Sequence, residues 1–213
     1  MTERTVVHLL RHGEVHNPEE VLYGRLPGYV LSDLGERMAI RVAEAVEDRD
    51  IVAVWASPLV RAQQSAQPTA VAKDLSIVTD ERLIEAANVF EGKSVTMDNG
   101  AFKQPKNWKY LVNPMRPSWG EPYKAVEARM REVINDARDA SRGHEILLVS
   151  HQLPVWTSRL SYEGRHLWHD PRKRQCNLAS LTSLAFDGDR LRAIVYTEPA
   201  ADLVALAHKG AGA

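Results

Sequence analysis

Three short apolar segments of this sequence are each followed by basic side chains. The segments are residues 6–10, 51–55 and 146–150, and each has the length of a strand. The side chains that follow them are Arg11, His12, Arg61 and His151. Because ligands bind beyond the carboxyl ends of the strands in an open α/β sheet, these four side chains are expected to meet in one pocket. Such a pocket suits the transfer of a phosphate group to an imidazole.

The two arginines can serve this transfer in two ways. A histidine attacks phosphorus only when its imidazole is neutral, and a nearby positive charge disfavours the imidazolium form. A guanidinium group also binds phosphate oxygens in a planar, bidentate manner. Arg11 and Arg61 therefore suit both tasks. His151 can donate a hydrogen bond to the oxyanion as charge builds on the phosphoryl oxygens.

Cleavage of a phosphate ester also requires a proton for the departing alkoxide, and a carboxylic acid near the pocket mouth is the usual source. Glu85 is the candidate because it follows a predicted strand at residues 75–78 and precedes a segment of different composition. Three other glutamates compete for this role: Glu14, Glu81 and Glu91.

Each candidate also has a plain structural interpretation. A histidine at a strand end is ordinarily a core residue, and Arg61 suits a solvated position in a first helical turn. Asn17 can form a turn before Pro18. His8 lies inside the first predicted strand and is expected to be a packed core residue.

The sequence predicts neither a metal site nor a cofactor. His12 and His16 have an i,i+4 spacing, but Gly13 and Pro18 make this segment a loop, and no third ligand follows at a usual spacing. A single cysteine, Cys176, excludes a disulfide framework and is expected to act as a small apolar residue.

Composition narrows the class of protein. The chain has 213 residues, which suits one domain with a substantial core and an insertion. Its 27 Lys and Arg residues nearly balance its 28 Asp and Glu residues, so neither nucleic acid nor a membrane surface is indicated as a partner. The apolar N-terminal stretch is short and is interrupted by Arg11 and His12, so a cytoplasmic protein without a signal peptide is expected. Oligomeric state is not indicated.

Strands and helices alternate from the start of the chain. This order predicts an α/β fold with a mostly parallel central sheet and helices on both faces. Ser32 is the expected cap of one helix. Ser57 followed by Pro58 predicts the start of another helix, which Pro68 is expected to kink or end. The strands are expected at residues 5–10, 51–55, 75–78 and 146–149, with a final hairpin around residues 187–188.

Residues 88–120 have a different composition and are predicted to form an inserted cap. They are rich in Asn, Gly, Pro, Lys and Trp, and between Lys93 and Arg116 they hold five basic residues and one acidic residue, Asp98. An amphipathic helix at residues 123–137 follows them. The basic residues of the cap and a later cluster are expected to be solvated, with steering of an anionic substrate as the alternative. The later cluster is Arg165, Arg172, Lys173 and Arg174, and the expected packing anchors are Trp108, Trp119 and Trp168.

Four blocks of the sequence together resemble the histidine phosphatase superfamily, the phosphoglycerate-mutase-like group. Each block alone is weak evidence, but the four occur in the order of that family from the first predicted strand to the last parallel one. The blocks are Arg11-His12-Gly13-Glu14 with residues 24–35, then residues 57–66, residues 83–92 and residues 149–151.

The resemblance implies a role for each matched position. His12 would be the nucleophile that becomes phosphohistidine, and Glu85 would be the proton donor. The asparagine lies one residue closer to the glycine than in the family pattern, which makes His16 an alternative phosphate contact. The phosphoryl group would be bound by Arg11, Arg61, His151 and Asn17.

The expected function is therefore that of a histidine acid phosphatase-like enzyme, which hydrolyses a small phosphorylated metabolite without a metal. One alternative is phosphotransfer of the phosphoglycerate mutase type, and the other is a non-catalytic regulator that binds a phospholigand. The predicted cap lacks the longer basic segments typical of true mutases, which favours hydrolysis. The substrate is not identified, although the basic bias suggests a second anionic group.

Overall fold

The computed structural model describes residues 4–93 and 120–207 and contains a six-stranded sheet. The strands are β1 (Arg4–Arg11), β2 (Ile51–Ala56), β3 (Ile77–Thr79), β4 (Glu145–Ser150), β5 (Leu181–Asp187) and β6 (Arg190–Thr197). Their order is β3-β2-β4-β1-β5-β6, in which the first four pair in parallel and β5 and β6 pair antiparallel. The predicted mostly parallel sheet and its final hairpin are confirmed.

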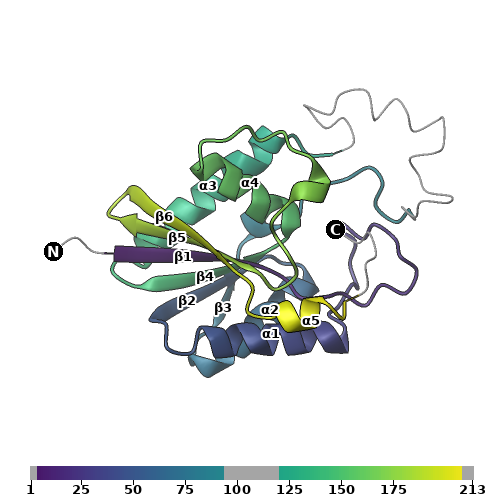
Figure 1. Cartoon of the computed structure of the whole chain (residues 1–213), viewed down its shortest axis with the longest axis horizontal. Helices are drawn as coiled ribbons and strands as arrows, with labels where there is room; N and C mark the ends of the chain where they lie inside the picture. Colours follow the sequence, from purple (N-terminus) through teal and green to yellow (C-terminus); the bar gives the residue numbers. More distant parts are fainter. Residues whose placement is uncertain (1–3, 94–119, 208–213) are drawn as a thin grey trace.

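Helices cover both faces of the sheet (Figure 1). They are α1 (Asp33–Ala45), α2 (Val60–Ala72), α3 (Tyr123–Ala140), α4 (Gln152–Tyr162) and α5 (Ala201–Val204), with single turns η1 (Glu81–Leu83) and η4 (Pro171–Lys173). The helices α3 and α4 lie over one face, and α1, α2 and α5 lie over the other. Successive side chains of a strand point to opposite faces, so β4 places Leu148 in the core under α3 and Val149 in the core under α1. Burial on both faces explains the continuous apolar character of this strand.

The register of the sheet brings three strand ends together. Arg11 pairs with Ser150 in parallel, and Ala56 pairs with Val149 on the other side of β4. The residues that follow these pairs therefore leave the sheet at the same edge, where an α/β fold binds its ligands. These residues are His12, Ser57 and His151.

The start of α1 is as predicted, whereas the start of α2 is not. Ser32 caps α1 because its hydroxyl accepts a hydrogen bond from the Gly35 amide at 3.0 Å. The helix α2 begins only at Val60, so its predicted start at Ser57 and Pro58 is wrong. The Ser57 hydroxyl lies 2.8 Å from His151 Nε2, and it accepts a long hydrogen bond from the Leu59 amide at 3.4 Å.

The helix α2 also continues through Pro68 to Ala72, so Pro68 does not end it, and a kink at this proline stays a prediction. A proline inside a helix costs about 3 kcal/mol because it removes one backbone hydrogen bond. Three alanines of α2 are buried in the core beneath α1 and α2: Ala62, Ala66 and Ala70. Their packing against the sheet offsets the cost of the proline.

Most of the predicted cap lies outside the described residues. Its two ends meet, because Asn88 and Gly120 form an isolated antiparallel bridge. Trp108 and Trp119 fall in the part that is not described. Trp168 is 53% exposed, so its predicted role as a packing anchor is wrong. It lies in the segment between α4 and η4, and such connecting segments run over the surface.

Within residues 4–93 and 120–207, no helix is both long enough and apolar enough to span a membrane.

Close backbone packing joins the segment after β1 to the first turn of α1. The Ser32 amide donates to the Glu14 carbonyl at 3.0 Å. A Cβ atom on Gly35 would lie 2.0 Å from that carbonyl oxygen, and one on Gly13 would lie 2.6 Å from the Gly35 carbonyl oxygen. Glycine at both positions therefore lets the segment that carries His12 lie against α1.

We expect Gly35→Ala to destabilise the protein, although a glycine-to-alanine change inside a helix ordinarily stabilises it by about 1 kcal/mol. The clash with the Glu14 backbone should lower the free energy of unfolding by about 1–3 kcal/mol. Denaturant unfolding monitored by circular dichroism measures the difference. Arg37→Ala, at an exposed position of the same helix, is the control and should change stability by less than about 0.5 kcal/mol. A Gly35→Ala protein as stable as the wild type would contradict this packing.

Candidate active site

His12 lies fully buried at the end of β1 with its protonation state fixed by its neighbours. Its Nδ1 lies 2.7 Å from the Gly13 carbonyl oxygen, which can only accept, so Nδ1 carries the proton. Its Nε2 accepts a hydrogen bond from Arg61 Nε at 3.4 Å. Burial, Arg61 and Arg11 hold the pKa of His12 well below its ordinary value. The ring is therefore neutral at neutral pH, with the lone pair of a nucleophile on Nε2.

Two buried guanidinium groups lie beside this ring. Arg61 Nη2 donates to the Gly24 carbonyl at 2.6 Å, and Arg11 Nη1 donates to the Cys176 carbonyl at 2.8 Å. Arg11 Nε is buried and has no hydrogen-bond acceptor among the described residues. Among the described residues, no carboxylate oxygen lies within 4.0 Å of either group. Two positive charges buried without a paired acid are costly, which indicates that the site binds an anion.

His151 lies next to His12 at the end of β4. The two ring centroids are 5.1 Å apart, and the rings meet edge to face. His151 Nε2 lies 2.8 Å from the Ser57 hydroxyl, and its Nδ1 is buried with no hydrogen-bond partner among the described residues. Burial and the neighbouring positive charges hold its pKa well below the ordinary value. When the Ser57 hydroxyl donates to Nε2, the ring proton lies on Nδ1. This N–H group can then donate a hydrogen bond to a phosphoryl oxygen.

Glu85 is buried where the chain leaves η1, and one carboxylate oxygen accepts a hydrogen bond from the Ala86 amide at 2.8 Å. Burial raises its pKa, and the nearby Arg61, Arg174 and Arg11 only partly oppose this effect. A carboxyl group that keeps its proton at a higher pH than usual suits a general acid.

The competing glutamates have other surroundings. Glu81 begins η1 and is exposed. Glu91 accepts a hydrogen bond from the Asn88 amide at 3.1 Å, and Glu14 accepts one from the Ser32 hydroxyl at the start of α1. Among the four candidates, Glu85 is therefore the carboxyl group that best suits proton donation.

The Asn17 side chain forms hydrogen bonds within its own segment. The Asn17 side chain donates to the Val21 carbonyl at 2.9 Å and accepts from the Val21 amide at 3.3 Å. It therefore forms a turn, the structural alternative that its position before Pro18 suggests. His16, the alternative phosphate contact, is exposed. A phosphate contact by either residue stays a prediction.

Tyr23 was not predicted to belong to the site. Its buried ring lies 6.4 Å from the His12 ring, and the Arg61 guanidinium carbon lies 4.8 Å from its centroid. The Tyr29 ring stacks against the Tyr23 ring with a centroid distance of 5.1 Å. An aromatic face under a guanidinium orients it through a cation–π interaction. Tyr23 directly precedes the block at residues 24–28, and this adjacency is the signal that could have identified it.

Ser65 holds the nucleophile segment against α2 and was also missed. Its hydroxyl accepts from the Gly13 amide at 3.1 Å and donates to the Arg61 carbonyl at 2.7 Å. Ser65 lies four residues after Arg61 on the same helix, so both side chains are on one face. This spacing is the signal that could have identified Ser65.

The later basic cluster is only partly the solvated face that was predicted. Arg165 and Arg172 are exposed and pair with Glu163 and Asp170. Arg174 is instead partly buried, and Nε and Nη1 of its guanidinium donate to His169 and Gln152. The prediction of a solvated Arg174 is therefore wrong, because neutral acceptors from two segments hold the side chain inward.

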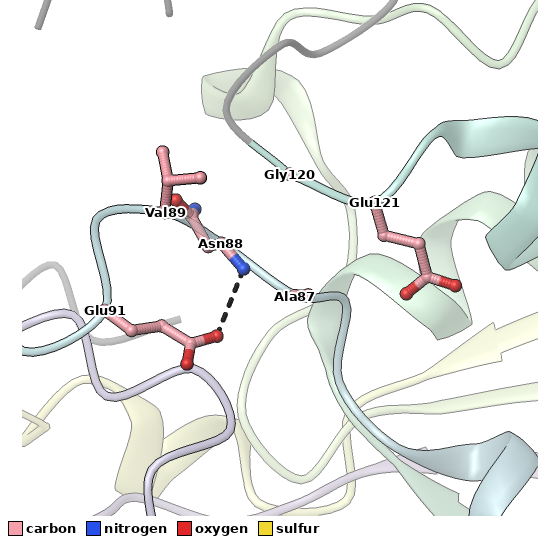
Figure 2. A pocket seen from close by; sticks show the side chains of 6 residues that line it. All are labelled: Ala87, Asn88, Val89, Glu91, Gly120 and Glu121. Atoms are coloured by element: carbon pink, nitrogen blue, oxygen red, sulfur yellow. Dashed lines mark hydrogen bonds between the residues drawn. The ribbon is translucent and has the colours of Figure 1, made fainter.

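A pocket of about 470 Å³ lies beside the segment that carries Glu85 (Figure 2). Its described lining residues are Ala87, Asn88, Val89, Glu91, Gly120 and Glu121. Glu121 is paired with Arg25 and Arg129, whereas Glu91 brings a further negative charge. Because no cation lines the described part of this pocket, phosphate chemistry is better assigned to the cluster around His12.

Among the described residues, no three His, Cys, Asp or Glu side chains are grouped so that they could hold a metal ion.

Several known proteins are similar to this chain. The family model for the histidine phosphatase superfamily (branch 1) matches residues 7–199. The uncharacterized protein Rv0525 of Mycobacterium tuberculosis is 57% identical over 201 residues, covering 94% of this chain and 100% of that protein. The probable phosphoglycerate mutase GpmB of Escherichia coli is 29% identical over 177 residues, covering 80% of each chain. The solved structure of YhfR from Bacillus stearothermophilus has a TM-score of 0.74 and 26% identity, covering 89% of this chain and 95% of that one.

Proposed function

The chain belongs to the histidine phosphatase superfamily, and from this membership we propose that it hydrolyses phosphomonoesters through a phosphohistidine formed on His12. The observation that carries the proposal is the neutral, buried imidazole of His12, whose Nε2 lone pair is free of a proton. Two buried nitrogen atoms close by, Arg11 Nε and His151 Nδ1, have no hydrogen-bond partner among the described residues. Together they suit a phosphoryl group whose phosphorus atom faces Nε2.

In the first step, His12 Nε2 attacks phosphorus and the bond between phosphorus and the ester oxygen breaks. Glu85 transfers its proton to the departing oxygen, so the leaving group departs as a neutral alcohol. Arg11, Arg61 and His151 stabilise the negative charge on the phosphoryl oxygens during the transfer.

In the second step, water attacks the phosphoryl group and the bond between phosphorus and Nε2 breaks. The Glu85 carboxylate left by the first step takes a proton from this water, which restores the acid form. His12 returns to its neutral state, and inorganic phosphate leaves. Each residue is then ready for the next substrate.

We expect this activity to survive a chelator. The buried guanidinium groups of Arg11 and Arg61 supply the positive charge that Mg²⁺ supplies in other phosphoryl-transfer sites. Phosphate release from a panel of phosphomonoesters should therefore be the same, within experimental error, with and without EDTA. A loss of activity in EDTA that a divalent metal restores would contradict the metal-independent mechanism.

The Escherichia coli relative favours a second candidate, because it is described as a probable phosphoglycerate mutase. A mutase returns the phosphoryl group from histidine to a hydroxyl of the sugar acid, and it needs a bisphosphate primer to stay phosphorylated. An isomerase activity that depends on this primer, without phosphate release, would favour the mutase. Binding of phosphate esters without either reaction would instead support a non-catalytic regulator.

A further inference from the structure

Arg174 differs from the basic residues around it. The side chain of its neighbour Arg172 is 90% exposed, whereas Arg174 turns inward from the segment between η4 and β5. Its Nε donates to His169 Nε2 at 2.8 Å, and its Nη1 donates to the Gln152 side-chain oxygen at 3.0 Å. Among the residues that the structure describes, no carboxylate oxygen lies within 4.0 Å of this guanidinium. Its positive charge is therefore held in place by neutral partners and is not cancelled by a paired acid.

Hydrogen bonds and ring contacts fix His169 in the orientation that accepts a hydrogen bond from Arg174. Its Nδ1 lies 2.7 Å from the Leu167 carbonyl oxygen, so Nδ1 carries the proton and Nε2 accepts the hydrogen bond from Arg174. The ring packs against Tyr123 and Trp156, with centroid distances of 5.4 Å and 5.9 Å. A guanidinium oriented in this way loses little conformational freedom when it binds a ligand.

Arg174 is connected to the catalytic cluster on two sides. Its acceptor Gln152 directly follows His151 at the start of α4. Two residues after Arg174, the Cys176 carbonyl accepts the hydrogen bond from Arg11 Nη1 at 2.8 Å. The segment 174–176 therefore carries the Arg174 guanidinium and also accepts the hydrogen bond that positions the Arg11 guanidinium.

Arg174 also lies near Glu85. Its charge, like those of Arg61 and Arg11, lowers the pKa of that carboxyl group. Arg174 and the proton donor are therefore near enough for their charges to interact. In an in-line transfer, the proton donor lies on the side of the leaving group.

We propose that Arg174 determines substrate specificity by binding an anionic group, a carboxylate or a second phosphate, on the leaving group of the substrate. This inference rests on the proposed function and specifies its substrate class. A guanidinium binds either group through charge-assisted hydrogen bonds, and it does not take part in the bond-breaking steps. The exposed neighbour Arg172 is instead paired with the carboxylate of Asp170, so we expect it to contribute no such selectivity.

The test compares pairs of substrates that differ only in the second anionic group. O-phosphoserine against O-phosphoethanolamine tests a carboxylate, and propanediol bisphosphate against propanediol monophosphate tests a second phosphate. We expect the wild type to prefer the more anionic member of one pair. Arg174→Gln should reduce this preference in kcat/KM by about tenfold to a hundredfold, mainly through KM, because one charge-assisted contact is lost. Arg172→Gln is the matched control and should keep the full preference.

Two results would overturn the inference: a wild type without preference in either pair, or an Arg174→Gln enzyme that loses activity equally on both members of each pair. Arg174→Lys covers the case in which the glutamine variant fails to fold, and a point charge without the planar fork should keep part of the preference. Failure of the proposed function is seen separately, as the lack of His12-dependent phosphate release from p-nitrophenyl phosphate. In that case calorimetric binding of the same pairs decides, since the preference and its loss in Arg174→Gln do not require turnover.

Discussion

Replacing His12 with alanine should reduce phosphate release by about ten thousandfold or more while the protein stays folded. The variant lacks the Nε2 that forms the covalent bond to phosphorus, and removal of a nucleophile is among the largest single effects on an enzyme. The remaining cations could still bind the substrate. Steady-state phosphate release, with circular dichroism to verify the fold, measures the effect.

A matched control for this variant lies in the same strand. His8 is also buried, and it bonds Ser183 and Glu145 at 2.7 and 2.8 Å, away from the candidate site. His8→Gln can keep a hydrogen bond and should retain the activity of the wild type. Substantial residual activity in His12→Ala would remove His12 from the role of nucleophile.

Replacing Glu85 with glutamine should affect substrates according to their leaving groups. The amide has nearly the same shape but does not donate a proton, so alkyl phosphates should lose about a hundredfold to ten thousandfold in kcat/KM. Aryl phosphates release a stable phenolate that needs no proton, so their kcat/KM should fall much less. Glu81→Gln, at an exposed position of η1, is the control and should behave as the wild type. An equal loss on both classes of substrate would mean that Glu85 is not the acid.

The pH profile gives this variant a second readout. His12 must be neutral, and its pKa is lowered, so kcat/KM falls only when the pH drops through that lowered value. Glu85 must be protonated, and its pKa is raised, so kcat/KM for alkyl phosphates falls as the pH rises through the raised value. In Glu85→Gln the loss at high pH should disappear and the loss at low pH should remain.

The central strands could be predicted because the apolar pattern of each segment agrees with its buried place in the sheet. Continuous apolar segments mark strands that are buried on both faces, and the polar residues after them mark the edge where ligands bind. The parallel pairing of Arg11 with Ser150 then brings His12 and His151 together without any further information. Glu85 was harder to single out, because the burial that raises its pKa depends on the folded surroundings of η1.

Two of the predictions that failed, those for Ser57 and Arg174, concern side chains that contact distant parts of the chain. The Ser57 hydroxyl lies 2.8 Å from Nε2 of His151, which is 94 residues away in the sequence, whereas α2 begins only at Val60. Arg174 stands among exposed basic residues, and its inward position follows from Gln152, 22 residues earlier. Neither partner can be identified from composition or spacing, because both are set by how the loops pack over the edge of the sheet.

The most direct test of the mechanism is to trap the covalent intermediate. The enzyme is mixed with a radiolabelled phosphomonoester, quenched with alkali during turnover, and digested to locate the label. We expect an acid-labile, alkali-stable phosphohistidine on His12 at a level that approaches one per active site when hydrolysis of the intermediate is slow, and no label in His12→Ala. Turnover without a labelled protein, or a label on another residue, would contradict the proposed mechanism.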